Sequence, residues 1–420
     1  MAIIYNRLQG GRGADMFEAI DDHTYRLKPI GKWTWHHFPV DVIKVISDAE
    51  LSVARLDEAA RFFRYKKALR RSLIITESIC SMRITGHKVT HRELLTEGFQ
   101  RFTAEMENGP SPIDTVPKTE SADTCEANSL VQALHYTHKT ISARKNIDLK
   151  FFVRLQEQLA QHAENAKGGL RTRPLPPLPF ANGYYYPPLP EEIEPLLKGV
   201  IEFCNEETCS PTFIAAVAHF YMELIVPFEW GNDRMGRLLS HAIYSRQNMW
   251  KSLVFPIGAL PAIATKQHAL SLLPYMTNKT VYPENIPDIL NSWITYCGQS
   301  MRMGAHFCSI YSQRIQEMSD KWLSSLGELR KNSTVRIILD ELPTTPVFNV
   351  PYLVEITGKS FTSVNEAVTH LIEAGVVNKT SRGKRNRTFE ASDVLDFYAW
   401  LERQILPRNV NAREAYLSIT

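Results

Sequence analysis

The sequence has few cysteines, little net charge and no long uninterrupted apolar run, so it lacks the usual signs of a disulfide-rich, nucleic-acid-binding or membrane protein. Only six of its 420 residues are cysteines, and none has C-x-x-C spacing, so we expect reduced thiols. The net charge of +3 is too small to predict a nucleic-acid or membrane partner by itself. The N-terminus lacks a signal-peptide-like apolar stretch, and the most apolar run, Phe213 to Phe228, is interrupted by His219 and Glu223. We therefore expect a folded cytoplasmic protein.

Apolar residues recur at helical spacing through most of the chain. This spacing predicts antiparallel helices from Val42 to about Ile84. Further helices are expected to begin near Asn128, Asp148, Glu191, Pro211 and Arg234, with a long one from Asn285 to Trp322. The stretch from Asn108 to Ala127 is rich in turn residues, so we expect a loop there. Because no alternating apolar and polar pattern typical of strands occurs among these helices, the sequence predicts one large all-α domain.

Prolines dominate the stretch from Gly168 to Pro190, GGLRTRPLPPLPFANGYYYPPLP. The four that lie closest together are Pro174, Pro176, Pro177 and Pro179. Because proline has no backbone N–H to donate, they exclude an ordinary central strand. We expect extended backbone with few donors.

The pattern changes after Lys331 and is typical of a helix-turn-helix followed by a β-wing. A short helix is expected from Val350 to Thr357, a turn at Gly358 and a longer helix from Thr362 to Ala374. The longer helix has no lysine or arginine, but the turn after it supplies Arg382, Lys384, Arg385 and Arg387. Phosphate contacts need positive charge, so this turn is a candidate DNA-binding wing. A solvated hairpin or a protein-binding module is an equally weighted alternative.

A candidate anion site lies in the sequence PFEWGNDRMGR, from Pro227 to Arg237. Gly231 and Gly236 would let the backbone approach an anion at a helix N-terminus, where free N–H groups attract negative charge. Arg234 and Arg237 have the spacing that projects two side chains from one helix face. The bland alternative is a common turn followed by solvated arginines.

The stretch from Ile225 to Arg237 resembles the signature of the Fic family, also called Fido, H-P-F-x-[D/N]-G-N-G-R-x-x-R. ITESICSMRITG, Ile75 to Gly86, resembles the family's inhibitory segment, and GYYYPPLPEEIEPLL is similar to the stretch that follows its flap. The resemblance implies an all-α Fic fold with a short flap hairpin and a C-terminal winged helix. It divides the chain into a helical region at 1–110, a Fic core at 111–330 and a winged helix at 331–420. Family members commonly transfer AMP from ATP to a hydroxyl group of a target protein.

Three signature positions depart from the family pattern. Val226 stands where the resemblance implies the general base, and an alkyl group cannot accept a proton; losing such a base costs about 10²- to 10⁴-fold. Trp230 stands at the implied magnesium-ligand position, so we expect no metal site and no Mg²⁺ there. Asp233 replaces a glycine of the phosphate loop, which adds a carboxylate and removes the easy φ > 0 conformation.

The inhibitory segment departs as well. The family pattern [S/T]-x-x-x-E-[G/N] corresponds here to Ser81, Thr85 and Gly86, so threonine replaces the inhibitory glutamate. Joint loss of the base, the metal ligand and the inhibitory residue predicts that AMP transfer is lost or severely impaired.

Two alternatives remain for the loop. Its candidate nucleotide-binding residues are Gly231, Asn232, Asp233, Arg234, Gly236 and Arg237. They could hold ATP, another nucleotide or a phosphate without magnesium, or Asp233 could pair with Arg234 or Arg237 and fill the pocket. His219 is expected to be a satisfied core side chain. We expect a regulator that binds DNA or protein through its winged helix, with a homodimer allowed and no membrane partner; the rival interpretation is a divergent transferase.

Overall fold

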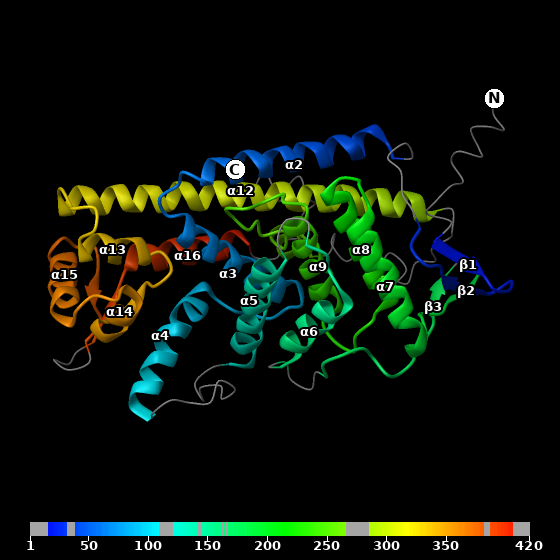
Figure 1. Ribbon diagram of the computed structural model, residues 1–420, viewed down its shortest axis with the longest axis horizontal. Coiled ribbons are helices and arrows are strands. Elements are labelled where there is room, and N and C mark those ends of the chain that lie inside the picture. The colour runs from blue at the N-terminus through cyan, green and yellow to red at the C-terminus, as the bar shows by residue number, and fades with distance from the viewer. Residues whose placement is uncertain are drawn as a thin grey trace.

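One long helix, α12 (Ile286–Leu326), extends along most of the molecule and organises the other helices (Figure 1). Helix α2 (Val40–Ala60) lies beside it, and its buried face includes Ile46, Ala49 and Val53. The two backbones come close at Gly298, where an added Cβ would lie 3.0 Å from a methyl group of Val45. A 41-residue helix is stable here because neighbours cover its apolar stripe along the whole length.

The computed structural model describes residues 16–31, 38–108, 121–141, 145–161, 163, 167–180, 182–265, 285–381 and 387–405. The expected predominance of helices is confirmed over these residues. None of the described helices is long and apolar enough to cross a bilayer.

The helical core surrounds α8 (Pro211–Ile225), in which every residue from Thr212 onward is buried. Helices α7 (Pro190–Glu206), α9 (Asn232–Arg246) and α12 pack against it. A helix that is apolar all round must be covered on every side, which explains its central place. The remaining helices of this part, among the described residues, are α3 (Lys66–Ile84), α4 (His91–Asn108), α5 (Ala122–Thr140), α6 (Leu149–Ala160) and α10 (Ala259–Ile263).

The predicted loop from Asn108 to Ala127 is wrong at its C-terminal end, because α5 already begins at Ala122. Ser121 caps this helix, and its side chain accepts a hydrogen bond from the backbone N–H of Thr124 at 3.1 Å. Serine before a helix is a recognised start signal that the turn-rich composition obscured. The correction matters because the extended first turns include Glu126.

A four-stranded sheet at the end of the molecule opposite the C-terminal helices has the order β1-β2-β4-β3. Strands β3 (Leu178–Phe180) and β4 (Gly183–Tyr185) form the expected flap hairpin, and Pro179 lies in the edge strand, as its missing N–H requires. Strands β1 (Phe17–Ala19) and β2 (Thr24–Leu27) were not expected. They are too short to give a pattern, and β2 pairs with β4, far along the chain.

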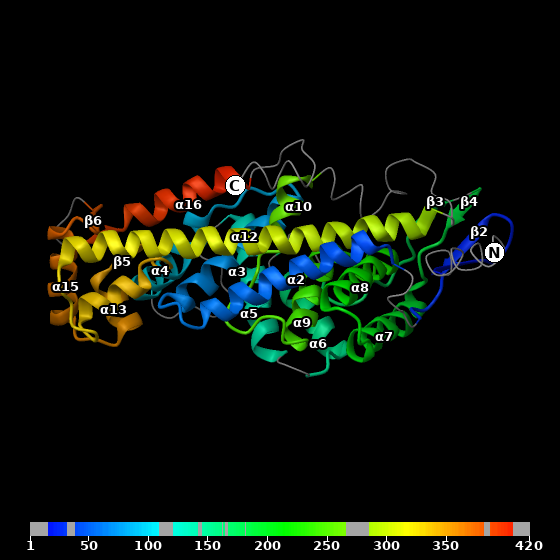
Figure 2. The same ribbon diagram turned by 90° about the horizontal axis from the view of Figure 1, so that it is seen from above.

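The C-terminal part contains α13 (Thr334–Glu341), β5 (Val347–Asn349), α14 (Val350–Thr357), α15 (Phe361–Glu373), β6 (Asn378–Lys379), β7 (Thr388–Glu390) and α16 (Ser392–Gln404). Its three strands pair in the order β5-β7-β6. The turn between α14 and α15 uses Gly358 in the left-handed conformation (φ 64°) and Ser360 as the next N-cap. Figure 2 shows α16 returning along α12, and both parts share one continuous hydrophobic core. Arg382, Lys384 and Arg385 lie outside the described residues.

Candidate functional site

The loop between α8 and α9 begins with a strained residue. Val226 ends α8 in the left-handed conformation, with φ 46° and ψ 61°, and its N–H donates to the Met222 carbonyl at 2.9 Å. A β-branched residue rarely adopts this conformation, and such strain costs about 1–3 kcal/mol. Val226 therefore has a strained backbone, and its alkyl side chain has no atom that can accept a proton.

Arg171 holds this strained loop against the flap, a role that sequence reasoning missed. Its Nε donates to the Val226 carbonyl at 2.7 Å, and its backbone N–H donates to the Pro227 carbonyl at 2.9 Å. Its Nη2 also donates to the Pro188 carbonyl. Burial lowers the pKa of Arg171. The carbonyls at a helix C-terminus need outside donors, and this buried guanidinium supplies one.

Asn232 and Gly236 serve the loop itself in this structure. The Asn232 side chain accepts from the Phe228 N–H at 3.0 Å and donates to the Phe228 carbonyl at 2.9 Å. A Cβ on Gly236 would lie 2.1 Å from Cδ2 of His219, so this glycine makes room for an imidazole; its predicted role in binding an anion stays a prediction. Gly231 has the left-handed conformation, with φ 81°.

Position 233 does not adopt the φ > 0 conformation that a glycine would allow, which agrees with the expectation from the sequence. Asp233 lies in the first turn of α9 and has no positive φ. A carboxylate in the first turn interacts favourably with the positive end of the helix dipole.

Arg234 is buried, only 4% exposed, and held by residues from three other segments. Its Nη1 pairs with Glu126 on α5, and its Nη2 donates to Thr85 Oγ1 at 2.8 Å. Its guanidinium lies 4.9 Å from the ring centroid of Trp230, within cation–π range. Burial, reinforced by the nearby Arg237, lowers the pKa of Arg234 to about 9. The carboxylate of Glu126 thus occupies the place beside Arg234 in which the sequence analysis expected a bound anion.

Arg237 is equally buried and has its own partners. Its Nη1 lies 2.5 Å from Asp233 Oδ2, and its Nε donates to Ser81 Oγ at 2.9 Å. Burial opposes the charged form, but attraction to Asp233 outweighs it and raises the pKa of Arg237. Nη2 of Arg237 and Nε of Arg234 are buried without a hydrogen-bond partner among the described residues. Each arginine therefore keeps one unused donor atom.

The inhibitory-type segment reaches both arginines from α3. Ser81 contacts Arg237, Thr85 contacts Arg234, and Gly86 follows the helix with φ 88°. Glu229, the remaining carboxylate of the loop, faces outward with an oxygen 3.6 Å from Nε of Arg173.

A cluster that the sequence interpretation missed lies next to Arg237. His219 is buried, but it is not the satisfied core side chain we expected, because its Nε2 has no hydrogen-bond partner in the described part of the chain. This atom lies 3.6 Å from Glu223 Oε1 and 3.6 Å from Asp233 Oδ1. Burial opposes protonation, but the two carboxylates outweigh it and raise the pKa of His219. The signal was available: His219 and Glu223 interrupt the apolar run at i, i+4 spacing, which places them on one helix face.

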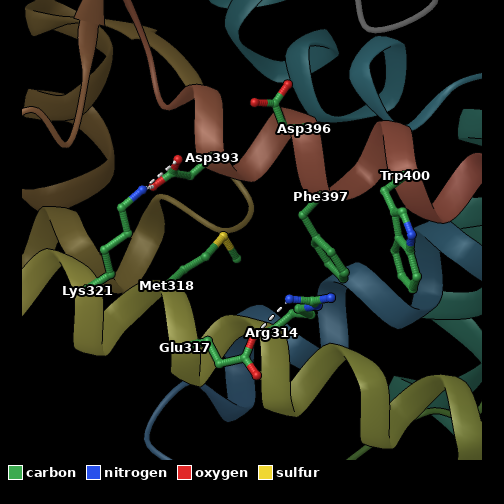
Figure 3. Close-up of a pocket in the computed structure, with 8 residues that line it drawn as sticks. All are labelled: Arg314, Glu317, Met318, Lys321, Asp393, Asp396, Phe397 and Trp400. Carbon is green, nitrogen blue, oxygen red and sulfur yellow. Dashed lines mark hydrogen bonds and ion pairs between the residues drawn. The ribbon is translucent and has the colours of Figure 1, made fainter.

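A pocket of about 340 Å³ lies away from this loop, between α12 and α16 (Figure 3). Phe397 and Trp400 point from α16 toward Arg314 on α12, and Arg314 lies 5.7 Å from the Trp400 ring centroid. An ion pair between Lys321 and Asp393 closes another side at 2.9 Å. None of the predicted site residues lines this pocket, so it is separate from the arginine loop.

The chain is similar to known proteins over part of its length. Residues 146–244 match the Fic/DOC family. Protein adenylyltransferase fic-1 of Caenorhabditis elegans is 33% identical over 93 residues, which are 21% of this chain and 17% of that protein. The chain thus spans about a sixth of that relative's length.

Solved structures of Fic proteins match parts of this chain with low sequence identity. A Fic family protein of Desulfovibrio desulfuricans has a TM-score of 0.45 and 13% identity, with 87% of this chain and 98% of that chain covered. A Fic-domain signalling protein of Bacteroides thetaiotaomicron has a TM-score of 0.45 and 15% identity, with coverage of 65% and 97%. A fragment of C. elegans Fic-1 has a TM-score of 0.44 and 18% identity, with coverage of 65% and 74%.

The family match spans the end of the α5–α6 connection, α6, the flap, α7, α8, the arginine loop and most of α9. The expected membership is confirmed for this part: residues 146–244 are a Fic/DOC family domain. All six signature-loop residues from Gly231 to Gly236, together with Arg237, lie within it.

Proposed function

We propose that this protein is a regulator built on a Fic domain whose AMP-transfer chemistry is lost or severely impaired. One observation carries the proposal: both signature arginines are bound by side chains of the chain itself. Arg234 pairs with Glu126, and Arg237 pairs with Asp233. A triphosphate would have to displace two buried ion pairs, and breaking a buried pair typically costs about 3–5 kcal/mol.

The base position supports the same proposal. Val226 cannot accept a proton, and His219, the imidazole on the same helix, is not placed to act instead. His219 precedes Val226 by seven residues on the same helix, a rise of about 10 Å, and it is 4% exposed. A target hydroxyl that reached Val226 would therefore find no base at His219.

Binding of a small anion remains compatible with the site. The unused donors on Arg237 and Arg234 could hold a phosphate or nucleotide, without magnesium, once Asp233 or Glu126 swings aside. In this proposal the nucleotide acts as a signal and not as a substrate. The C-terminal part would pass that signal on by binding DNA or protein.

The direct test is transfer of label from nucleotide to protein. Full-length protein would be incubated with radiolabelled ATP, UTP or CDP-choline, with Mg²⁺ or Mn²⁺ and cell lysate, and label would be counted on gels. We expect none above background. Label that appears in the wild type and disappears in Arg237→Ala would overturn the proposal.

The second candidate is a divergent nucleotidyltransferase that modifies a protein hydroxyl. It is favoured by the similarity to a relative named as a protein adenylyltransferase. It requires a base and a metal in places that the family signature does not provide, and the labelling experiment separates it from the regulator.

A further inference from the structure

Three potential metal ligands meet at the contact between α8 and α9. His219 and Glu223 lie one turn apart on α8, and Asp233 lies in the first turn of α9. His219 and Glu223 are 4% and 9% exposed, and the ligand atoms of all three residues lie within 4.8 Å of one another. It is the one group of this kind among the residues that the structure describes.

The distances in this group are too long for hydrogen bonds and suit a shared ion. Nε2 of His219 lies 3.6 Å from an oxygen of each carboxylate, beyond ordinary N–H···O range. Two ligand atoms bound to one tetrahedral Zn²⁺ with bonds of about 2.0–2.2 Å are about 3.4 Å apart. The two separations from His219 are therefore close to those around one ion, and all three ligand atoms lie within 4.8 Å of one another.

Two of these atoms also lack any other use. Nε2 of His219 and Oε1 of Glu223 are buried and have no hydrogen-bond partner among the described residues. Leaving such atoms unsatisfied costs about 1–3 kcal/mol each, and more when the group is charged. A bound cation would satisfy both.

The surroundings orient the three ligands. The ring of His219 lies against Gly236, where no larger residue fits, and makes an edge contact with Trp293 at 5.2 Å between centroids. Arg237 binds the second oxygen of Asp233, which leaves Oδ1 directed at His219. Outer contacts of this kind fix metal ligands in known sites.

Room for a further ligand exists beside the cluster. A cavity of about 30 Å³ is lined by His219, Arg237 and Ser240, among other residues. This volume holds a water molecule, and a water commonly completes a three-residue zinc site.

We propose that His219 Nε2, Glu223 Oε1 and Asp233 Oδ1 bind one divalent transition-metal ion, of which Zn²⁺ is the best-fitting representative. The donor set of one imidazole and two carboxylates suits this class. The ion would tie α8 to the first turn of α9 and would hold Asp233 in place to bind Arg237. The site does not use the signature's magnesium position at Trp230, and it stands whether or not the protein transfers a nucleotide.

The test is metal binding by the full chain. Protein stripped with a chelator would be titrated with Zn²⁺ against a chromogenic competitor, and Co²⁺ loading would be followed by visible absorption. We expect one ion per chain, a tetrahedral Co²⁺ band and a higher melting temperature with Zn²⁺. Glu223→Gln, which keeps the side-chain shape, should weaken binding at least about 10-fold and remove the band.

A matched control comes from a second buried pair. His241 Nε2 lies 3.6 Å from Glu77 Oε1, and both residues are buried, but no third ligand joins them among the described residues. His241→Gln should therefore keep the ion and the band. Equal metal affinity in wild type and Glu223→Gln would overturn the proposal, as would the absence of a stoichiometric ion and of any Zn²⁺ effect on the wild-type melting temperature. An imidazole of His219 that stays doubly protonated by NMR when Zn²⁺ is added would do the same.

Discussion

Asp233 and Arg237 are bound to each other one helical turn apart in α9, with Oδ2 and Nη1 separated by 2.5 Å. Both belong to the loop that resembles a nucleotide-binding signature, yet the aspartate occupies the guanidinium that would face a phosphate. Ser81 binds the same guanidinium at 2.9 Å. If an anion binds at Arg237, it must therefore outcompete Asp233 and Ser81.

Releasing Arg234 should make the protein respond to anions. Glu126→Gln removes the charge that pairs with Arg234 and leaves a buried cation, so stability should fall by about 3 kcal/mol or more. ADP or inorganic phosphate should then raise the melting temperature of the variant more than that of the wild type. Differential scanning fluorimetry at several ligand concentrations measures both effects.

Glu229→Gln is the matched control for that experiment. Glu229 lies in the same loop but faces Arg173, which is 77% exposed, so its loss should change stability by less than about 0.5 kcal/mol. A ligand response in Glu229→Gln as large as that in Glu126→Gln would contradict the assigned role of Glu126.

Relieving the strain at Val226 should stabilise the protein. Asparagine tolerates the left-handed conformation, so Val226→Asn should raise the free energy of unfolding by about 1 kcal/mol. Asn248, the other described non-glycine residue with positive φ (56°), provides the opposite case: Asn248→Ala should lower it by a similar amount. Urea titrations measure both changes, and a destabilised Val226→Asn would show that Val226 is not strained.

Restoring the signature tests whether the scaffold can still transfer AMP. In Val226→His/Trp230→Asp/Asp233→Gly, the base and metal positions return and the carboxylate on Arg237 is removed. We expect Mg²⁺-dependent labelling from ATP that exceeds the wild type by about 10²-fold or more, the usual contribution of a general base. Adding Arg237→Ala to this variant should abolish the label. If the triple variant transfers no label, then the flap or the Glu126–Arg234 ion pair must also prevent the reaction.

Acid should destabilise the fold through buried histidines. Burial lowers the pKa of His91, and burial with the nearby His241 holds the pKa of His138 well below its ordinary value. Because the pKa of each histidine is lower in the folded state than in the unfolded state, each stays neutral in the fold where it would be protonated when unfolded. The stability that depends on the neutral form is therefore complete above about pH 6.5 and is lost as the pH falls below that value.

His91 and His138 should each lower the stability measured by urea unfolding between pH 7.5 and 5, by up to about 1.4 kcal/mol per pH unit. The raised pKa of His219 acts in the opposite direction and should offset part of this decline. His138→Gln can keep the hydrogen bond to Ser245, which is 2.8 Å long in the wild type, and should make the decline shallower. A wild type that becomes more stable toward pH 5, or an unchanged slope in the variant, would contradict this assignment.

DNA binding through the C-terminal part would depend on salt. Arg387 donates to Asn365 of α15 at 2.7 Å, which places one basic residue of the predicted wing beside the predicted recognition helix. If this surface binds DNA, Arg385→Ala/Arg387→Ala should weaken retention and reduce the salt slope by about 0.9 for each lost phosphate contact. Lys198→Ala on α7, at a distance from the C-terminal part, serves as control. Unchanged retention in the double variant would exclude the wing as the DNA-binding surface.

Local patterns in the sequence determined most of the helices, the proline-bearing edge of the flap and the Fic-like loop. Helical periodicity, prolines and a contiguous motif act over a few residues, so they can be read without knowing what lies nearby in space. The same reasoning failed at Glu126, which a turn-rich stretch concealed, and at strands β1 and β2, whose pairing is long-range.

Only the tertiary structure decided what the loop residues contact. The sequence could not show that Glu126 and Thr85 meet Arg234, because the three residues belong to separate segments: α5, the C-terminal cap of α3, and α9. Nor could it show that Gly236 faces His219, or that Asp233 joins His219 and Glu223 in one cluster. Residue type determines which charges and ligands a protein possesses, but packing between helices determines which of them pair, and pairing here decides whether the arginines face an anion.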